Sequence, residues 1–191
     1  MQTRESRFSV AVVCVFLLLL QATGASAAQT RAEREARDVA RLQREVNHQL
    51  LLLPWYSVFD NLQYRINGTQ VVLSGQVLHD TLKGDAERAV KDIEGVTKVI
   101  NNIELLPPSP ADDAIRRATY RAIYGQSGLE VYGVGNLQAI HIIVKNGHIT
   151  LEGTVLNQGH KNLAGIQANG VPGTFSVTNN LRVEPSQRNK K

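Results

Sequence analysis

The chain has 191 residues and a formal net charge of +4 at pH 7, which permits a polyanionic partner without requiring one. Its single cysteine, Cys14, excludes an internal disulfide, so each folded unit must be stabilised by its own buried apolar surface. The length suits one domain or two small ones.

Residues 1–27 are typical of a secretory signal peptide. Arg4 and Arg7 precede the apolar run Val10–Leu20, and Ala25-Ser26-Ala27 provides a small-residue cleavage site. The run is too short to cross a bilayer, which takes roughly 20 residues. We therefore expect cleavage near Ala27, which removes Cys14 and leaves an exported, soluble protein without a lipid anchor.

A helix is predicted at the start of the mature chain. Thr30 and Glu33 have the spacing of a capping box, in which each side chain bonds the other's backbone N–H. Apolar residues then recur every three or four positions, as they do on one face of a helix. They are Val39, Leu42, Val46 and Leu50.

Two strands, a second helix and a third strand follow. Apolar residues at alternate positions predict a hairpin with one buried face, formed by Leu62, Tyr64, Ile66, Val71, Leu73 and Val77. From Asp80 to Gly95 the period is helical again, with inward-facing Leu82, Ala86, Ala89, Val90 and Ile93. The third strand is expected at about residues 97–105.

The second half of the chain repeats the first at a constant spacing. The segment Leu73–Val77, LSGQV, corresponds to Leu151–Val155, LEGTV. The same shift carries residues 62–66 onto residues 140–144, and Asn101-Asn102-Ile103 onto Asn179-Asn180-Leu181. A constant shift across three separated segments indicates a duplicated structural unit.

The second copy is predicted to contain the same elements. Ser109-Pro110-Ala111-Asp112 caps its first helix, whose inward residues are Ile115, Ala118, Thr119 and Ala122. In its hairpin, Asn146-Gly147 favours a type I′ turn, whereas Asn67-Gly68-Thr69 favours a different loop in the first copy. The last strand is expected at about residues 175–183.

Glycines mark two further features. Gly75 and Gly153 each interrupt a strand, where the missing side chain is expected to let the covering helix approach closely. Gly159, Gly165 and Gly170 interrupt the last helical segment, so a short or frayed helix is predicted there.

The order helix, strand, strand, helix, strand, performed twice, predicts an α+β protein. We expect two tandem small αββαβ sandwiches, each with helices packed on one face of a three-stranded mixed sheet. The predicted domains cover residues 28–106 and 112–184, joined by a Pro-rich linker at 107–111 and followed by a basic tail at 185–191.

This arrangement resembles the BON domain, with L-x-G-x-V ending the second strand and G-V-x-x-V-x-N-x-I leading into the third. The motifs are Val71–Val77 and Gly95–Ile103, then Ile149–Val155 and Asn179–Leu181. The second copy departs from the pattern through additional residues before Asn179 and a Gly-rich insertion, Gly125–Asn136. The resemblance implies a periplasmic protein, because proteins with paired BON domains are typically periplasmic. It also implies a role in osmotic stress, envelope integrity or phospholipid binding, with which the family is associated.

The sequence shows no arrangement that supports catalysis, so we expect neither an enzyme nor a cofactor. Once Cys14 is removed, the chain has no thiol, and its glycines lack the spacing of a phosphate-binding loop. His141 and His148 alternate with the apolar residues of their strands, and His141 is expected opposite Glu152. Both are interpreted as plain surface histidines rather than metal ligands.

Two basic helix faces are candidate binding surfaces. In the first helix, Arg34, Arg37, Arg41 and Arg44, together with His48, form a stripe opposite the apolar face. Arginine suits phosphate groups, although the favoured interpretation of this stripe is a solvated face.

The second candidate is the helix after Ser109, which has Arg117, Tyr120, Arg121 and Tyr124 outward and Arg116 at the edge. This composition is typical of a lipid headgroup boundary. Alternatively, the tyrosines cover Leu129–Val134 or the first unit.

The most apolar mature stretch is Leu50–Tyr56. If exposed, this stretch would insert into a membrane as a wedge, but we expect its leucines to end the helix in the core and Trp55 to pack between the units.

Our leading hypothesis is binding of anionic phospholipid or a membrane surface, without a nucleic-acid partner. The alternative is a module that docks onto another envelope protein through a sheet edge or through Trp55 and Tyr56. Sensing of a soluble ligand such as a cation is a third hypothesis, without an acidic cluster to support it.

Overall fold

The computed structural model describes residues 31–134 and 139–185. The predicted signal peptide, its cleavage site, Thr30 of the capping box and nearly all of the basic tail lie outside these residues. The described chain opens with a helix over residues 31–51. The chain divides into two compact units at Arg44 and Glu45, within this helix, and the larger unit contains the sheets of both repeats.

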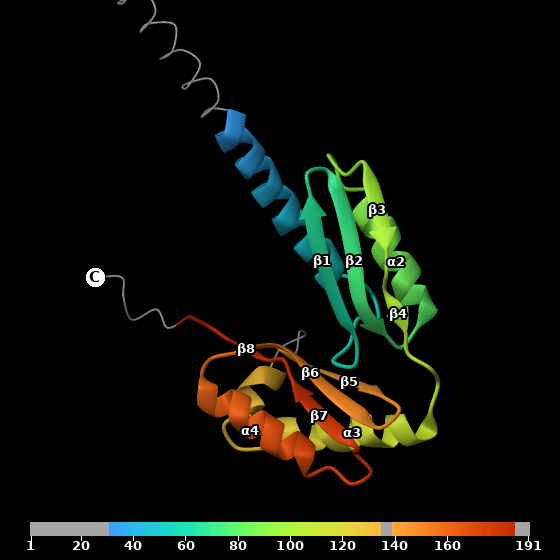
Figure 1. Ribbon diagram of the computed structural model, residues 1–191, viewed down its shortest axis with the longest axis vertical. Helices are drawn as coiled ribbons and strands as arrows, with labels where there is room; N and C mark the ends of the chain where they lie inside the picture. Colours follow the sequence, from blue (N-terminus) through green and yellow to red (C-terminus); the bar gives the residue numbers. More distant parts are fainter. Residues whose placement is uncertain (1–30, 135–138, 186–191) are drawn as a thin grey trace, which may run out of the picture. The chain divides into compact units, whose positions relative to one another are not determined.

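The first repeat contains a mixed sheet (Figure 1). Strands β1 (Asn61–Asn67) and β2 (Gln70–Val77) form an antiparallel hairpin, and helix α2 (Asp80–Lys91) follows. The chain then returns parallel to β2 in two short pieces, β3 (Lys98–Asn101) and β4 (Glu104–Leu105). Val71, Leu73 and Val77 are fully buried, as the alternating pattern predicts.

The second repeat has the same order of elements. They are α3 (Pro110–Tyr124), the 3₁₀ helix η1 (Glu130–Gly133), β5 (Ile140–Lys145), β6 (His148–Val155), α4 (Gln158–Asn169), β7 (Ser176–Asn179) and β8 (Arg182–Val183). Strand β6 pairs antiparallel with β5 and parallel with β7 and β8 (Figure 1). The predicted α+β class, with tandem αββαβ units and mixed sheets, is confirmed.

The interruption of each last strand explains the repeated asparagine. Asn101 Oδ1 accepts a hydrogen bond from the backbone N–H of Ile103 at 3.1 Å, and its Nδ2 donates to the backbone oxygen of Lys83 on α2 at 3.0 Å. Asn179 makes the same two contacts, with the N–H of Leu181 at 3.2 Å and the backbone oxygen of Lys161 on α4 at 2.7 Å. In each repeat, one asparagine side chain therefore stabilises the break in the strand and bonds it to the preceding helix.

The two hairpin turns differ as predicted. Asn146 and Gly147 both have positive φ, at 52° and 78°, which is the pattern of a type I′ turn. In the first repeat Asn67 pairs with Gln70, and of the two residues between them only Gly68 has positive φ.

The predicted role of Gly75 and Gly153 is wrong. Their φ angles are +112° and +117°, in the region that side chains rarely adopt. A Cβ on Gly75 would lie 1.9 Å from the backbone oxygen of Asn61, and one on Gly153 would lie 2.0 Å from that of Ala139. The neighbouring strand, not the covering helix, requires glycine here.

The prediction of a short or frayed last helix is also wrong. Helix α4 has 12 residues, the same length as α2. Asn157 caps it, because its side chain accepts a hydrogen bond from the backbone N–H of His160 at 2.9 Å. Ala164, Gly165 and Ala168 are buried against the rest of the repeat. Tertiary packing therefore overrides the low helix propensity of the glycines.

Within residues 31–134 and 139–185, no helix combines the length and apolarity needed to cross a bilayer.

Candidate functional site

Helix α3 does not present the whole Arg/Tyr face that its sequence predicts. Arg116, expected at the edge of a lipid-binding face, is 2% exposed. Its guanidinium pairs with Asp113 at 2.5 Å and donates to the backbone oxygen of Val144 at 2.6 Å. Arg116 therefore joins α3 to β5 and is not available to a lipid.

The two tyrosines of α3 are also turned toward the protein. Tyr124 donates its hydroxyl to the backbone oxygen of Ile140 at 2.5 Å and packs its ring over Gly133. Burial raises the pKa of the Tyr124 hydroxyl above its ordinary value. Tyr120 contacts the rings of Tyr124 and Phe59. Tyr124 thus covers Gly133 of the insertion, in line with the alternative interpretation, and Tyr120 contacts Phe59 of the first unit. Of the predicted face, Arg117 and Arg121 are exposed.

The N-terminal helix matches its predicted pattern. Leu42, Val46 and Leu50 are buried. The predicted basic stripe is exposed at Arg34, Arg37, Arg41 and Arg44. Arg37 donates to the backbone oxygen of Glu33 at 3.2 Å and approaches its carboxylate. The exposure of this stripe does not test whether it binds phosphate, and that interpretation stays a prediction.

The apolar segment that ends this helix is placed differently from the prediction. Trp55, expected to pack between the units, is 80% exposed, and Leu52 is 64% exposed. Leu50 is buried as expected. The structure therefore presents two large apolar side chains to solvent, three residues apart.

Trp55 lies in a turn with an unusual backbone. The N–H of Tyr56 donates to the oxygen of Leu53 at 3.3 Å, and Pro54 and Trp55 occupy the two central positions. Trp55 has a φ of 71°. Proline followed by positive φ is the pattern of a type II turn, whose third residue is normally glycine. A bulky residue at this φ costs about 1–3 kcal/mol, and such strain concentrates at functional sites.

The chain just after Trp55 is fixed by contacts on both sides. The buried Asp60 carboxylate accepts hydrogen bonds from the backbone N–H groups of Ser57 at 3.0 Å and Leu78 at 2.8 Å. The oxygen of Val58 accepts from the N–H of Ile142 at 2.8 Å, along the edge of β5. The Trp55 turn is therefore presented by a rigid base.

Tyr56 and His141 complete this base. Their rings stack with centroids 5.4 Å apart, and Tyr56 Oη lies 3.4 Å from His141 Nε2. Burial raises the pKa of Tyr56 to about 12 and lowers the pKa of His141. His141 does lie opposite Glu152 as predicted, but it is half-buried, so its interpretation as a plain surface histidine is wrong.

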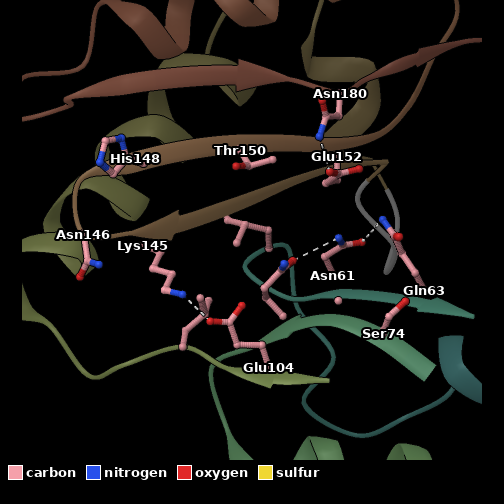
Figure 2. Close-up of a pocket in the computed structure, with 14 residues that line it drawn as sticks. Asn61, Gln63, Ser74, Glu104, Lys145, Asn146, His148, Thr150, Glu152 and Asn180 are labelled. Atoms are coloured by element: carbon pink, nitrogen blue, oxygen red, sulfur yellow. Dashed lines mark hydrogen bonds and ion pairs between the residues drawn. The ribbon is translucent and has the colours of Figure 1, made fainter. Parts of the chain in front are cut away.

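A polar cleft of about 560 Å³ lies between the sheets of the two repeats (Figure 2). Figure 2 shows Asn61, Gln63 and Ser74 on one wall. The opposite wall comes from the second repeat, with Thr150, Glu152, His148 and Asn180. We call this space the inter-repeat cleft.

The charged groups of the inter-repeat cleft have partners inside it. Lys145 of β5 forms an ion pair with Glu104 of β4 across the cleft. Glu152 accepts a hydrogen bond from Asn180 Nδ2 at 2.7 Å. Among the described residues, no group of three or more His, Cys, Asp or Glu side chains has the arrangement of a metal site.

Sequence reasoning missed both the exposed turn and the cleft. The pair Pro54-Trp55 signals a turn, but the apolar run before it suggested core packing. The cleft residues occupy the polar alternate positions of the strands. This pattern indicates an outer face, without indicating that two outer faces meet.

Comparison with known proteins identifies the repeated unit. A family model for the BON domain matches residues 38–107 and again residues 112–185. No curated protein matches the chain. Among solved structures, it is similar to CdsD, a structural protein of the type III secretion system of Chlamydia trachomatis, at 14% identity over 78% of this chain and 94% of that chain, with a TM-score of 0.32. It is similar to the C-terminal domain of CdsD at 14% identity, covering 74% of this chain and 96% of that chain, with a TM-score of 0.31.

The two matches of the BON domain model cover more than half of the chain. The chain therefore belongs to the BON domain family and carries two such domains in tandem.

Proposed function

We propose that this chain is a non-enzymatic, periplasmic binding protein that attaches to membrane surfaces containing anionic phospholipid. The observation that carries the proposal is the exposure of Trp55 on a turn with a rigid base and of Leu52 just before that turn. Membership of the BON family supports a binding role.

The chemistry of this turn suits the boundary between lipid headgroups and acyl chains. Tryptophan favours that boundary because its ring is apolar and its N–H remains able to bond water or a headgroup. Leu52 adds a purely aliphatic side chain just before the turn. Because Trp55 is strained where glycine would be relaxed, a requirement for its side chain outside the fold explains its presence.

Arg117 and Arg121 supply an electrostatic contribution in this proposal. Both lie four residues apart on α3 and are exposed, so they share one face of the helix. A basic side chain near an anionic membrane surface contributes about 1 kcal/mol. This attraction is screened by salt, whereas insertion of Trp55 is not.

The chain's single tryptophan makes the test direct. The protein is titrated with vesicles of phosphatidylcholine and phosphatidylglycerol while its fluorescence is recorded. Binding through the turn shifts the emission of Trp55 to shorter wavelength and protects it from acrylamide, in parallel with co-sedimentation. Co-sedimentation without a spectral change would overturn the assignment of this turn as the contact.

Matched variants distinguish insertion of Trp55 and Leu52 from nonspecific adsorption of exposed apolar side chains. Burial of a large apolar side chain contributes about 1.5–3 kcal/mol, so Trp55→Ser and Leu52→Ser each weaken binding about tenfold or more. Phe175→Ser and Ile166→Ser are the controls, because these residues are 80% and 66% exposed elsewhere on the second repeat. Arg117→Glu with Arg121→Glu weakens binding at low salt and has little effect at high salt.

The same side chains also suit a protein interface, because tryptophan is enriched among the residues that contribute most to protein binding. Vesicles that leave both sedimentation and Trp55 emission unchanged would contradict the membrane proposal. A Trp55-dependent complex with an envelope protein, stable at high salt and without lipid, would then favour docking onto that protein.

A further inference from the structure

We infer that the inter-repeat cleft binds a neutral, polyhydroxylated small molecule such as a sugar. This inference is independent of membrane attachment, because it rests on different residues. It follows from the side chains that line the cleft, the pairing of its charges and its dimensions.

One wall of the cleft is a patch of uncharged hydrogen-bonding groups. Asn61 is opposite Gln76, and Gln63 is opposite Ser74, in the β1–β2 ladder. Side chains at alternate positions share one face of a sheet, so these four lie together. Carboxamides and hydroxyls both donate and accept hydrogen bonds, as sugar hydroxyl groups do.

These carboxamides are only weakly bonded to one another. Asn61 Nδ2 lies 3.4 Å from Gln76 Oε1, and Gln63 Nε2 lies 3.4 Å from Asn61 Oδ1. Good hydrogen bonds of this kind are about 2.7–3.2 Å long. A ligand hydroxyl between the amides would replace two poor contacts with better ones.

The opposite wall supplies complementary groups from the second repeat. Thr150 contributes a hydroxyl on β6, beside Ile143 on β5, whose side chain is only 4% exposed. The groups available on this wall are therefore polar and suit the hydroxyls at the edge of a sugar ring. Asn180 and Asn146 add further carboxamides.

The charges of the cleft argue against an anionic ligand. Lys145 pairs with Glu104, and Glu152 is a second carboxylate, bonded to the neutral Asn180, that would repel an anion. Among the described residues that line the cleft there is no Phe, Tyr or Trp, which disfavours an aromatic or lipid ligand. The absence of a metal-ligand cluster among the described residues disfavours a divalent cation.

The size of the cleft fits a small sugar. Its volume of about 560 Å³ lies within the roughly 300–1,000 Å³ range of small-molecule sites. The walls come from two repeats, so a ligand that bonds both would also stabilise their contact by mass action.

The test is a titration of the full mature chain with glucose, N-acetylglucosamine and maltose, followed by NMR of the Asn and Gln side-chain amides. At least one sugar should produce saturable shifts in the amides of Asn61, Gln63 and Gln76. Sodium acetate and calcium chloride at equal concentrations should leave these amides unchanged. Failure of all three sugars to give saturable shifts, or stronger effects from either salt, would overturn the proposal.

Variants localise the site. Ser74→Phe fills the cleft and should weaken binding at least tenfold, and Gln63→Ala, a milder change at an exposed position, should weaken it several-fold. Asn162→Ala is the matched control, because Asn162 is an exposed carboxamide on α4 outside the cleft. Circular dichroism confirms that each variant is folded. Equal affinity in Gln63→Ala and wild type would place the sugar outside this cleft and refute the assignment.

Discussion

At the scale of the residue, Trp55 shows how one side chain is retained against the preference of its backbone. It occupies the third position of a type II turn at a φ of 71°, where glycine is relaxed. It is 80% exposed, so packing offsets little of the strain. The chain just after the turn is fixed by the hydrogen bond between Ser57 and Asp60 and by that between Val58 and the edge of β5. A substitution at this position can therefore weaken binding without lowering the free energy of unfolding.

Trp55→Gly should remove membrane binding without destabilising the fold. Relief of strain of about 1–3 kcal/mol outweighs the greater chain entropy that glycine adds to the unfolded state, about 0.5–1 kcal/mol. We expect the free energy of unfolding to be unchanged or raised by about 1 kcal/mol, measured by urea unfolding followed by circular dichroism. Trp55→Ala is the control, because it loses the ring and keeps the strain. A Trp55→Gly variant less stable than Trp55→Ala would show that the strain argument is incorrect.

At the scale of the element, regular periodicity was sufficient to predict the hairpins, α2 and the tandem α+β class. A helix was predicted at α4, but its full length was not, because that depends on close packing of Gly165 against Asn179. A Cβ on Gly165 would lie 2.8 Å from Asn179 Nδ2. Local propensity carries no information about such a contact between distant segments.

The candidate site was less predictable than the fold. Periodicity placed Arg117 and Arg121 correctly on an exposed face, yet it also placed Tyr120 and Tyr124 there. The helical period cannot show that the insertion supplies Gly133 as a surface for Tyr124. Polar alternation in the strands likewise indicates an outer face and does not reveal a cleft between two such faces.

The asparagine that joins each strand break to its helix gives a prediction at this scale. Asn179→Ala leaves the N–H of Leu181 and the oxygen of Lys161 without their side-chain partner, which costs about 1–3 kcal/mol for buried groups. We expect a corresponding loss of the free energy of unfolding in urea. The neighbour Asn180 is the control, because it is exposed and its side chain bonds only the exposed-face partner Glu152 among the contacts described. Equal losses in Asn179→Ala and Asn180→Ala would contradict the structural role of the repeated asparagine.

At the scale of the whole molecule, the segment before β1 connects the two repeats. Val58 is buried in the core of the second repeat, although it precedes the first strand of the first repeat. Tyr56 covers His141 of β5, and Lys145 of the same strand pairs with Glu104. The outer face of β5 therefore contacts the segment before β1 at His141 and the first repeat at Lys145, and Ile143 between them is 4% exposed. The repeats are stabilised in part by this shared contact.

This contact should make the stability of the molecule sensitive to mild acid. Burial is the main cause of the lowered pKa of His141, and Asp60 and Glu152 oppose it only in part. The unfolded chain therefore binds the proton more readily than the folded one. Above the ordinary histidine pKa of about 6.5, both states are neutral and His141 has no effect on stability. As the pH falls below about 6.5, stability is lost progressively until the pH reaches the lower folded-state pKa.

Urea unfolding followed by circular dichroism, between pH 7.5 and pH 5.5, measures this loss. His141→Gln should remove part of the pH dependence, because glutamine does not titrate. His148→Gln should retain it, because His148 is an exposed histidine at the end of the same hairpin. Identical pH profiles for His141→Gln and wild type would show that protonation of His141 does not weaken the contact between the repeats.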